Sequence, residues 1–217
     1  EHGIMVFPEG IDRDQTGEKP KNQQRTKSRS SRRRYFRRKR RKQMLLAVLI
    51  REGLCPLSRE SLTRWIKDDA YPEDASFRDW FKMQPYPLRA EALDRPLNPH
   101  ELGRVLYHMD QRRGFRSNRK EGDGEQKKFH SGDADRGIRG YVETQDLLNT
   151  HVTMGKVAMH LSQQAKVDAV RRRFVKRDDY VKEFDLIWNK QSDLHGNDSL
   201  GAQLTEKLHD EIGAPFD

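Results

Sequence analysis

The spacing of apolar and polar residues along the chain predicts a mainly α-helical protein. From Gln23 to Glu52 neither proline nor glycine interrupts the sequence, and the residues that predominate are good helix formers. We expect a single long helix here that ends at Gly53, with Pro56 three residues beyond. Its first half is almost entirely cationic, whereas Met44–Ile50 is apolar on nearly every side.

The clearest local signature is that of a helix beginning after Asn98. Asn98 is a favourable N-cap, Pro99 suits the first helical position and Glu101 stands at the third, as in a capping box. Gly114 is expected to end this helix, and His108, outside its apolar face, is expected at the surface or in a satisfied polar interface. The apolar face has the spacing i, i+3, i+4, i+7 and consists of Leu102, Val105, Leu106 and Met109.

Other helices are expected on both sides of this one. Ser58 can cap a short helix that carries Leu62, Trp65 and Ile66. Two more are expected near Gly155–Val175 and Asp178–Asn189, with Asp178 and Asp179 at the favourable N-terminal end of the second. The apolar face of the second comprises Tyr180, Val181, Phe184, Ile187 and Trp188.

The remaining segments are expected to be largely non-helical. Gly3–Phe7 is a short strand-forming run, and Glu9–Asn22 is a polar linker. Proline punctuates an irregular stretch from Tyr71 to Pro99, and five glycines predict a mobile loop from Glu121 to Gly140. The fold class expected is therefore mainly α, with a short N-terminal β segment.

Composition shows that the positive charge is concentrated in one place. The chain of 217 residues is 33% hydrophobic and 35% charged, with a formal charge of +9. Twelve basic residues and no acidic residue occur between Arg25 and Lys42, so the rest of the chain is slightly acidic. This asymmetry excludes a general cationic coat and favours one anion-binding element, for which nucleic acid is the expected partner.

Several other classes of protein are excluded or disfavoured. Cys55 is the only cysteine, so neither an intramolecular disulfide nor a cysteine-rich zinc site can form, and a reducing, cytoplasmic setting is expected. The longest apolar run, Met44–Ile50, is far shorter than the roughly 20 residues of a membrane helix, so no membrane partner is expected. Metalloprotease, phosphate-loop and nucleophile-elbow motifs are missing, and we expect no catalytic residue, metal or cofactor in this chain.

The basic half of the long helix is the first candidate element for binding RNA or DNA. Its arginines recur at i, i+4 and repel one another, so an anion is expected to stabilise the helix, and guanidinium groups can grip phosphate with two hydrogen bonds. The alternative is a disordered basic tail, which the directly following apolar run argues against. Tyr35 and Phe36 either stack on bases or pack against protein. The candidate residues are Arg25, Arg29, Arg32, Arg33, Arg34, Arg37, Arg38, Arg40, Arg41 and Lys42.

A second basic cluster follows the helix that begins after Asn98. Its cations and polar donors suit phosphate and 2′-hydroxyl groups of RNA. The alternative interpretation is that the cations only offset the helix dipole while Phe115 makes the hydrophobic contact of a C-cap. The candidate residues are Arg112, Arg113, Phe115, Arg116, Ser117, Asn118 and Arg119.

Taken in order, these stretches resemble type II CRISPR RNA-guided DNA endonucleases, particularly the compact subtype C enzymes. Arg25–Lys42 with its apolar continuation is similar to the arginine-rich bridge helix of that family. Gln84–Leu93 and Leu102–Lys120 resemble the opening of its recognition lobe, and Tyr180–Trp188 with Gln191 resembles a later helix of the lobe. Gly3–Gly10 resembles the strand after the first nuclease motif.

The resemblance implies roles for particular residues. By it, Arg112, Arg113, Phe115, Arg116 and Asn118 would meet the guide scaffold or the heteroduplex backbone. Arg89, in the stretch Gln84–Leu93, is counted with the RNA-binding residues. The arginines implied to hold guide-RNA phosphates are Arg29, Arg32, Arg33, Arg37, Arg40 and Arg41.

The resemblance also implies an organisation and partners. Residues 1–22 would end a RuvC-like nuclease segment, 23–53 would form the bridge helix, and 54–217 would form an incomplete helical recognition lobe. The implied partners are guide RNA (crRNA with tracrRNA, or a single guide RNA), target DNA and the remaining nuclease domains, with magnesium needed by the complete nuclease. The catalytic aspartate would lie upstream of Gly3, so this chain alone is expected to bind RNA and to cut nothing.

Two other classes compete with this interpretation. A non-nuclease RNA-binding protein, such as a ribosome-associated factor, can carry a basic helix but would lack the recognition-lobe signature. A DNA-binding transcription factor would need a dimerising seam, and Met44–Ile50 is only about two turns long, too short for a zipper.

Overall fold

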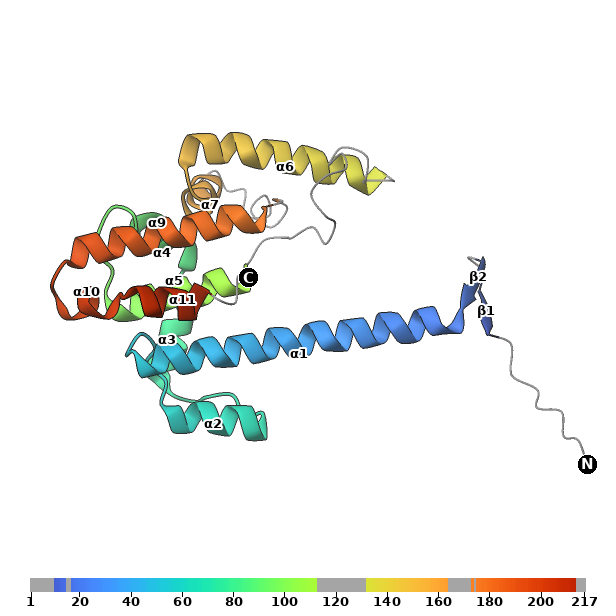
Figure 1. Ribbon diagram of the computed structural model, residues 1–217, viewed down its shortest axis with the longest axis horizontal. Helices are drawn as coiled ribbons and strands as arrows, with labels where there is room; N and C mark the ends of the chain where they lie inside the picture. Colours follow the sequence, from blue (N-terminus) through green and yellow to red (C-terminus); the bar gives the residue numbers. More distant parts are fainter. Residues whose placement is uncertain (1–9, 15–16, 113–131, 164–172, 174, 214–217) are drawn as a thin grey trace, which may run out of the picture. The chain divides into compact units, whose positions relative to one another are not determined.

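The computed structural model describes residues 10–14, 17–112, 132–163, 173 and 175–213, and in them the protein is mainly helical, as predicted (Figure 1). Two compact units are present, residues 1–41 and 42–217. The strands are β1 (Ile11–Asp14) and β2 (Gly17–Pro20). The helices are α1 (Lys21–Arg51), α2 (Arg59–Asp68), α3 (Ala75–Lys82), α4 (Pro85–Glu91), α5 (Pro99–Gln111), α6 (Gly132–His151), α7 (Met154–Gln163), α9 (Arg177–His195), α10 (Ser199–Gln203) and α11 (Glu206–Gly213).

Strands β1 and β2 occupy most of the segment expected to be a linker. They pair antiparallel, with Ile11 opposite Pro20, and the backbone amide of Lys21 then donates to the Gly10 carbonyl at 2.8 Å. The expectation of a linker over Glu9–Asn22 was therefore wrong, because backbone pairing in a short polar hairpin leaves no alternation of apolar residues in the sequence. The strand predicted for Gly3–Phe7 lies outside the described residues.

Helix α1 has the length and the end that the sequence predicts. Its last turn leads into Gly53, whose φ of 68° is a left-handed conformation that glycine adopts without a Cβ penalty. The amide of Leu54 donates to the Leu49 carbonyl at 2.7 Å and closes the helix end. Within the second unit Leu45, Leu46 and Leu49 are buried, so the apolar half of α1 belongs to a packed core.

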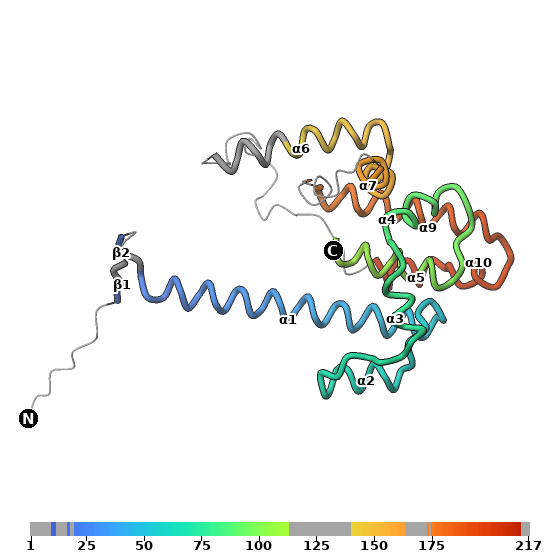
Figure 2. The backbone as a smooth tube through the Cα atoms, turned by 180° about the vertical axis from the view of Figure 1, so that it is seen from behind, coloured from blue at the N-terminus to red at the C-terminus, as the bar shows by residue number. Residues whose placement is uncertain are grey.

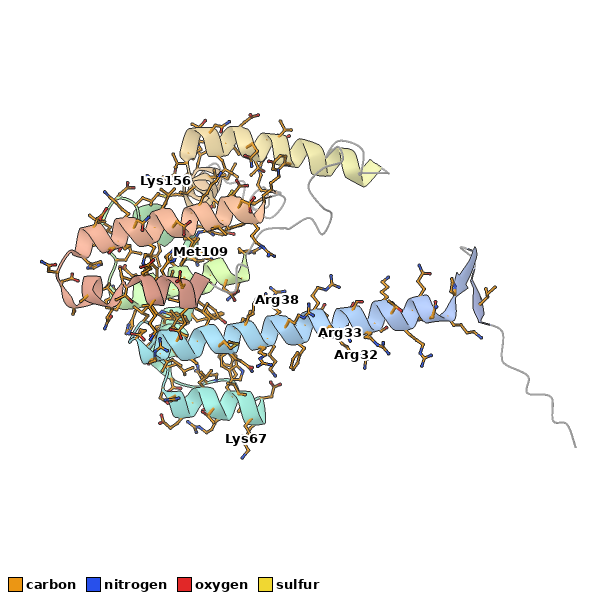
Figure 3. The ribbon with its side chains drawn as sticks, in the orientation of Figure 1. Arg32, Arg33, Arg38, Lys67, Met109 and Lys156 are labelled. Atoms are coloured by element: carbon orange, nitrogen blue, oxygen red, sulfur yellow. The ribbon has the colours of Figure 1, made fainter. Side chains whose placement is uncertain are left out.

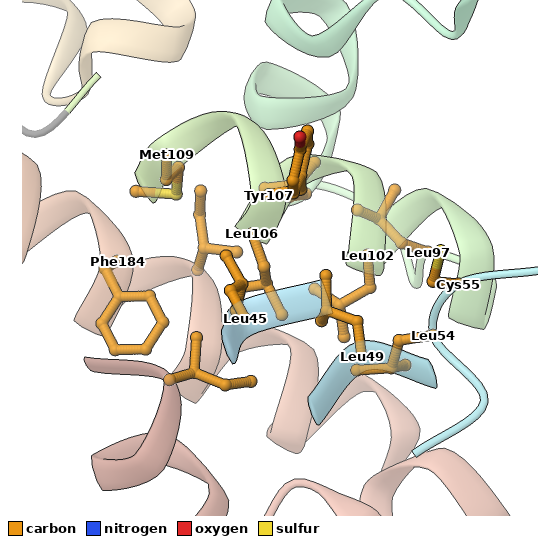
Figure 4. Packing of buried hydrophobic residues seen from close by; sticks show 14 of the residues in the cluster. Leu45, Leu49, Leu54, Cys55, Leu97, Leu102, Leu106, Tyr107, Met109 and Phe184 are labelled. Atoms are coloured by element: carbon orange, nitrogen blue, oxygen red, sulfur yellow. The ribbon is translucent and has the colours of Figure 1, made fainter. Parts of the chain in front are cut away.

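Helix α5 lies at the centre of that core. The capping box is confirmed: Glu101 N–H donates to Asn98 Oδ1 at 2.9 Å, and Asn98 N–H donates to Glu101 Oε2 at 3.0 Å. The predicted apolar stripe of α5 is fully buried, and Figure 4 shows Leu106 beside Leu45 and Leu102 beside Leu49. Gly103 in the same helix approaches the backbone of Leu54 so closely that a Cβ would lie 1.9 Å from its carbonyl oxygen. The chain just after α1 and the first half of α5 are therefore packed backbone against backbone.

The proline-rich segment from Tyr71 to Pro99 is more ordered than expected. It contains α3 and α4, and α4 begins with Pro85 at a first-turn position, where a missing N–H costs nothing. Proline therefore starts a helix here where the sequence analysis expected irregular chain. Helix α6 likewise begins at Gly132, inside the expected loop, and α7 covers the start of the helix predicted near Gly155–Val175, most of whose second half lies outside the described residues.

The later helices are linked to α5 through α4 and α9, and α6 lies beside α7 (Figure 2). Helix α9 contacts α5, α7, α10 and α11, and α4 contacts both α5 and α7. The apolar face predicted for α9 is confirmed, since Tyr180, Phe184, Ile187 and Trp188 are buried and Val181 packs at its edge. Cys55 is also buried, and burial raises the pKa of its thiol to about 11, so it is an unreactive core residue.

Candidate nucleic-acid interface

Helix α1 is a cationic rod over its first five turns. The helix carries fourteen basic residues and no acidic one, and every basic side chain from Lys21 to Arg40 is exposed. Because successive residues advance by about 100° around a helix, these charges point to all sides; Figure 3 labels Arg32, Arg33 and Arg38 among them. The segment can therefore bind anions on more than one side at once.

Two aromatic side chains interrupt this rod. Tyr35 is 68% exposed and Phe36 is 65% exposed, and neither belongs to the apolar core formed by the described residues. A large exposed ring between arginines is suited to stacking on a nucleobase. Of the two roles expected from the sequence, packing into the apolar core is not seen among the residues that the structure describes.

The C-terminal end of α1 is held by an ion pair within the second unit. Both Arg51 guanidinium Nη atoms donate to the carboxylate of Glu211 in α11, at 2.9 and 2.7 Å. Hydrogen bonds to Glu211 and to Glu52 raise the pKa of Arg51. The hydrogen bond from Arg51 lowers the pKa of Glu211. Because the Arg51 and Glu211 side chains are 53% and 36% exposed, this bidentate contact sets the register between α1 and α11 more than it stabilises the fold.

Of the second basic cluster, only its first member is within the described residues. Arg112 is exposed, and its backbone amide donates to the Met109 carbonyl at 3.0 Å as α5 ends. The remaining predicted members, together with the Gly114 stop, lie outside the described residues: Arg113, Phe115, Arg116, Ser117, Asn118 and Arg119. Their RNA-binding role stays a prediction.

Arg89 is the one candidate that the structure corrects. Its side chain has no exposed surface, and its Nε and Nη2 donate to both carboxylate oxygens of Glu183 at 2.9 and 2.5 Å. Burial alone would lower the pKa of Arg89, but the Glu183 charge raises it overall. A guanidinium enclosed in this way cannot reach a phosphate, so Arg89 is a structural residue and not part of the RNA-binding surface.

His108 completes the surroundings of Arg89. It is 7% exposed, and its Nδ1 accepts from Arg89 Nη1 at 3.3 Å, while its ring lies edge-on to Tyr86 at 4.9 Å. Burial, followed by the charges of Arg89, Arg104 and Arg112, lowers the pKa of His108 to about 2. The sequence analysis expected His108 either at the surface or in a satisfied polar interface. The surface position was wrong, and the structure shows the interface, in which the neutral imidazole accepts a hydrogen bond from Arg89.

Glu183 was not singled out from the sequence. It lies on the apolar face of α9, three residues after Tyr180 and four before Ile187, and it also accepts from the Gly155 amide at 3.1 Å. A Cβ at Gly155 would come within 2.7 Å of Arg89 Cβ. Helix α7 can therefore pack this closely against α4 only because residue 155 is a glycine. A lone acid on an otherwise apolar helix face was the available signal for a buried ion pair.

Gln191 acts as a second buried polar connector. Its Nε2 donates to the carbonyls of Ala92 and Arg95 at 2.6 and 2.9 Å, and its Oε1 accepts from Leu97 N–H at 2.8 Å. These bonds satisfy the backbone between α4 and α5. The residue thereby fixes the approach of the chain to the capping box at Asn98.

The described residues contain neither a metal-binding cluster nor a membrane-spanning helix. No group of three or more His, Cys, Asp or Glu side chains there is arranged to hold a metal ion. No helix in that part of the chain combines the length and apolar character needed to cross a bilayer.

Comparison with solved structures identifies the fold. The chain superposes on Campylobacter jejuni Cas9 in complex with sgRNA and target DNA (AGAAACA PAM), with a TM-score of 0.61, 20% identity and coverage of 88% of this chain and 24% of that one. A second C. jejuni Cas9 complex with sgRNA and target DNA (AGAAACC PAM) superposes with a TM-score of 0.58 and 19% identity. The match covers 87% of this chain and 24% of that one. The St1Cas9–sgRNA–tDNA20–AcrIIA6 dimeric assembly superposes with a TM-score of 0.61 and 18% identity. The match covers 90% of this chain and 20% of the Cas9 chain.

These likenesses concern the fold, because the sequences are only 18–20% identical. No protein-family model matches the chain, and neither does any curated protein sequence. The chain spans 20–24% of the length of the Cas9 chains it matches. The fold of this chain is thus similar to that of part of these Cas9 chains.

Proposed function

We propose that this chain is the guide-RNA-binding portion of a CRISPR RNA-guided DNA endonuclease of the Cas9 type. The observation that carries the proposal is the 31-residue helix α1, which is densely cationic and free of acids, and whose apolar end is built into a helical body with a Cas9-like fold. The solved structures with that fold contain sgRNA and target DNA, which supports nucleic acid as the ligand class here.

The proposed mechanism is backbone recognition by charge and shape. Exposed arginines on all sides of α1 would neutralise phosphates of a folded guide and of the guide–target heteroduplex, while base pairing supplies sequence specificity. Tyr35 and Phe36 would stack on unpaired bases between these contacts. Leu45 and Leu49 anchor the apolar end of the helix in the core of the second unit.

Cleavage is assigned to the complete effector. In this proposal the nuclease domains and their magnesium ions are outside the residues described here, and the subtype C assignment is inferred from the sequence resemblance. The chain itself contributes RNA binding and orientation. A ribosome-associated basic-helix protein is the class that the fold comparison disfavours.

The proposal is tested by charge reversal on α1. Arg33→Glu combined with Arg37→Glu replaces two exposed cations on one helix face, and we expect affinity for guide RNA to fall by more than tenfold. Fluorescence anisotropy of labelled guide RNA measures this, and circular dichroism checks that the helical signal is retained. Unchanged affinity would remove α1 from the interface.

A charge-matched control distinguishes the effect of removing binding residues on α1 from the effect of changing the net charge of the chain. Arg59→Glu with Arg64→Glu makes the same change on α2, where both side chains are exposed. We expect a loss of less than threefold for this variant. An equal loss in both variants would reduce the interaction to nonspecific attraction by the whole chain.

A further inference from the structure

A second buried arginine, Arg104 in α5, is held very differently from Arg89. Only 7% of its surface is exposed, and its guanidinium lies over the rings of Trp80 and Phe81, with Cζ to ring-centroid distances of 5.8 and 5.1 Å. Both Nε and Nη1 are buried without a hydrogen-bond partner in the part of the chain that the structure describes. These N–H groups can donate, but the described protein offers them no acceptor.

Arg89, the other buried arginine of this helical body, has the partners that Arg104 lacks. The same helical body gives Arg89 a bidentate carboxylate, a histidine acceptor and two flanking rings. Arg104 has only the aromatic part of such a site, and burial lowers the pKa of its guanidinium. Buried polar groups without partners are rare in native proteins, and where they occur an ion or a function accounts for them.

The surroundings indicate where an anion would enter. Phe81, the ring nearest the guanidinium, is 39% exposed and so forms a partial cover at the surface. Arg104, His108 and Arg112 recur at i, i+4, i+8 and thus follow one side of α5. The series ends at the exposed Arg112, where the second basic cluster begins.

We propose that Arg104 is a receptor for a backbone phosphate of bound RNA, reached when the Phe81 ring moves aside. That the ligand is RNA rests on the proposed function. That Arg104 forms an anion site does not depend on it. The aromatic rings hold the guanidinium in place, and the missing acceptor is supplied by the ligand. Phosphate is favoured over a protein carboxylate because the strongest feature of the chain is a helix suited to polyphosphate.

The test is Arg104→Met, which keeps an apolar chain of similar length against Trp80 and Phe81. Removing an unpaired buried charge is expected to raise the melting temperature of the free 217-residue chain by about 2 °C or more. The same variant is expected to bind guide RNA about tenfold more weakly and to lower the slope of log affinity against log salt by about 0.7. Greater stability together with weaker binding is the signature of a site built for a ligand.

Three outcomes would overturn the proposal. If Arg104→Met bound RNA as tightly as the wild type, the guanidinium would be only a packing element. A melting temperature of Arg104→Met below that of the wild type would lead to the same conclusion. Arg59→Met removes an exposed charge from α2 as the matched control and should change neither property appreciably. A similar loss of affinity in that control would attribute the effect to net charge.

Inorganic phosphate provides a readout independent of RNA. At constant ionic strength, phosphate should raise the melting temperature of the wild type but not of Arg104→Met, and Phe81→Ala, which removes the cover, should respond at lower phosphate concentration. Stabilisation by acetate and not by phosphate would assign the site to a protein carboxylate. If wild-type chain bound no guide RNA yet showed the phosphate response, the proposed function alone would fail.

Discussion

Arg89 and Glu183, 94 residues apart in the sequence, form a bidentate ion pair with no exposed surface on either side chain. The pair joins α4 to α9, and the Gly155 amide and the His108 ring bring α7 and α5 into the same network. Four helices are therefore positioned by one polar cluster in an apolar interior. Such a cluster specifies a unique packing only while all its members are present.

The first prediction concerns this pair. Glu183→Leu leaves a buried guanidinium unpaired and is expected to lower the free energy of unfolding by about 3–5 kcal/mol. Arg89→Met combined with Glu183→Leu removes both charges and is expected to cost much less. Urea unfolding followed by circular dichroism measures the difference. The exposed pair of Lys82 and Asp79 is the control, and Asp79→Asn should change stability by less than about 0.5 kcal/mol.

The second prediction is a pH dependence caused by His108. Its pKa is about 2 in the folded protein against 6.5 ordinarily, so the unfolded chain binds a proton that the folded chain does not. Stability from this group is full above pH 6.5 and is lost as pH falls, at up to about 1.4 kcal/mol per pH unit. Between pH 6.5 and 5 the wild type should lose about 2 kcal/mol more than His108→Gln, whose amide still accepts from Arg89. The exposed His100 supplies the control, because His100→Gln should leave the slope of the wild type intact.

The third prediction concerns backbone strain between α6 and α7. Val152 has a φ of 67°, which is rare for a β-branched residue, and it is 64% exposed. Val152→Gly relieves the strain and is expected to raise the free energy of unfolding by about 1 kcal/mol. Val142→Gly, at an exposed position inside α6, should lower it by a similar amount. Thermal unfolding of the two variants should give shifts of opposite sign, and a shared sign would show that the φ of Val152 is not strained.

The fourth prediction concerns the ordering of α1. Twelve like charges between Arg25 and Lys42 repel one another, so amide protons there should exchange quickly in the free chain at low salt and slowly once guide RNA binds. Amides of α5 should be protected in both states, because its cap and buried stripe do not depend on RNA. Hydrogen exchange with mass spectrometry resolves the two segments. Equal protection of Arg25–Lys42 in both states would contradict the view that phosphate stabilises this helix.

Salt dependence gives the same prediction a thermodynamic measure. If six to ten phosphates are engaged, log affinity should fall with log salt at a slope of about −4 to −9. A slope near zero would mean that charge neutralisation contributes little to binding.

The sequence by itself determined the features whose causes are local. The long helix and its stop at Gly53 follow from helix propensity and one glycine, and the capping box at Asn98 requires residues only three positions apart. The cationic character of α1 is equally local, because no acid occurs anywhere in it. The apolar stripes of α5 and α9 were visible for the same reason.

Only the tertiary structure decided which arginines face solvent. Arg89 and Arg104 look as available as Arg33 in the sequence, yet Glu183 encloses the first and two rings from α3 enclose the second. Burial depends on groups that are distant along the chain, and a charge can be buried only where such a group, or a ligand, balances it. Local sequence carries no record of that balance, and so the resemblance that counted Arg89 with the RNA-binding residues could not show that its side chain is buried.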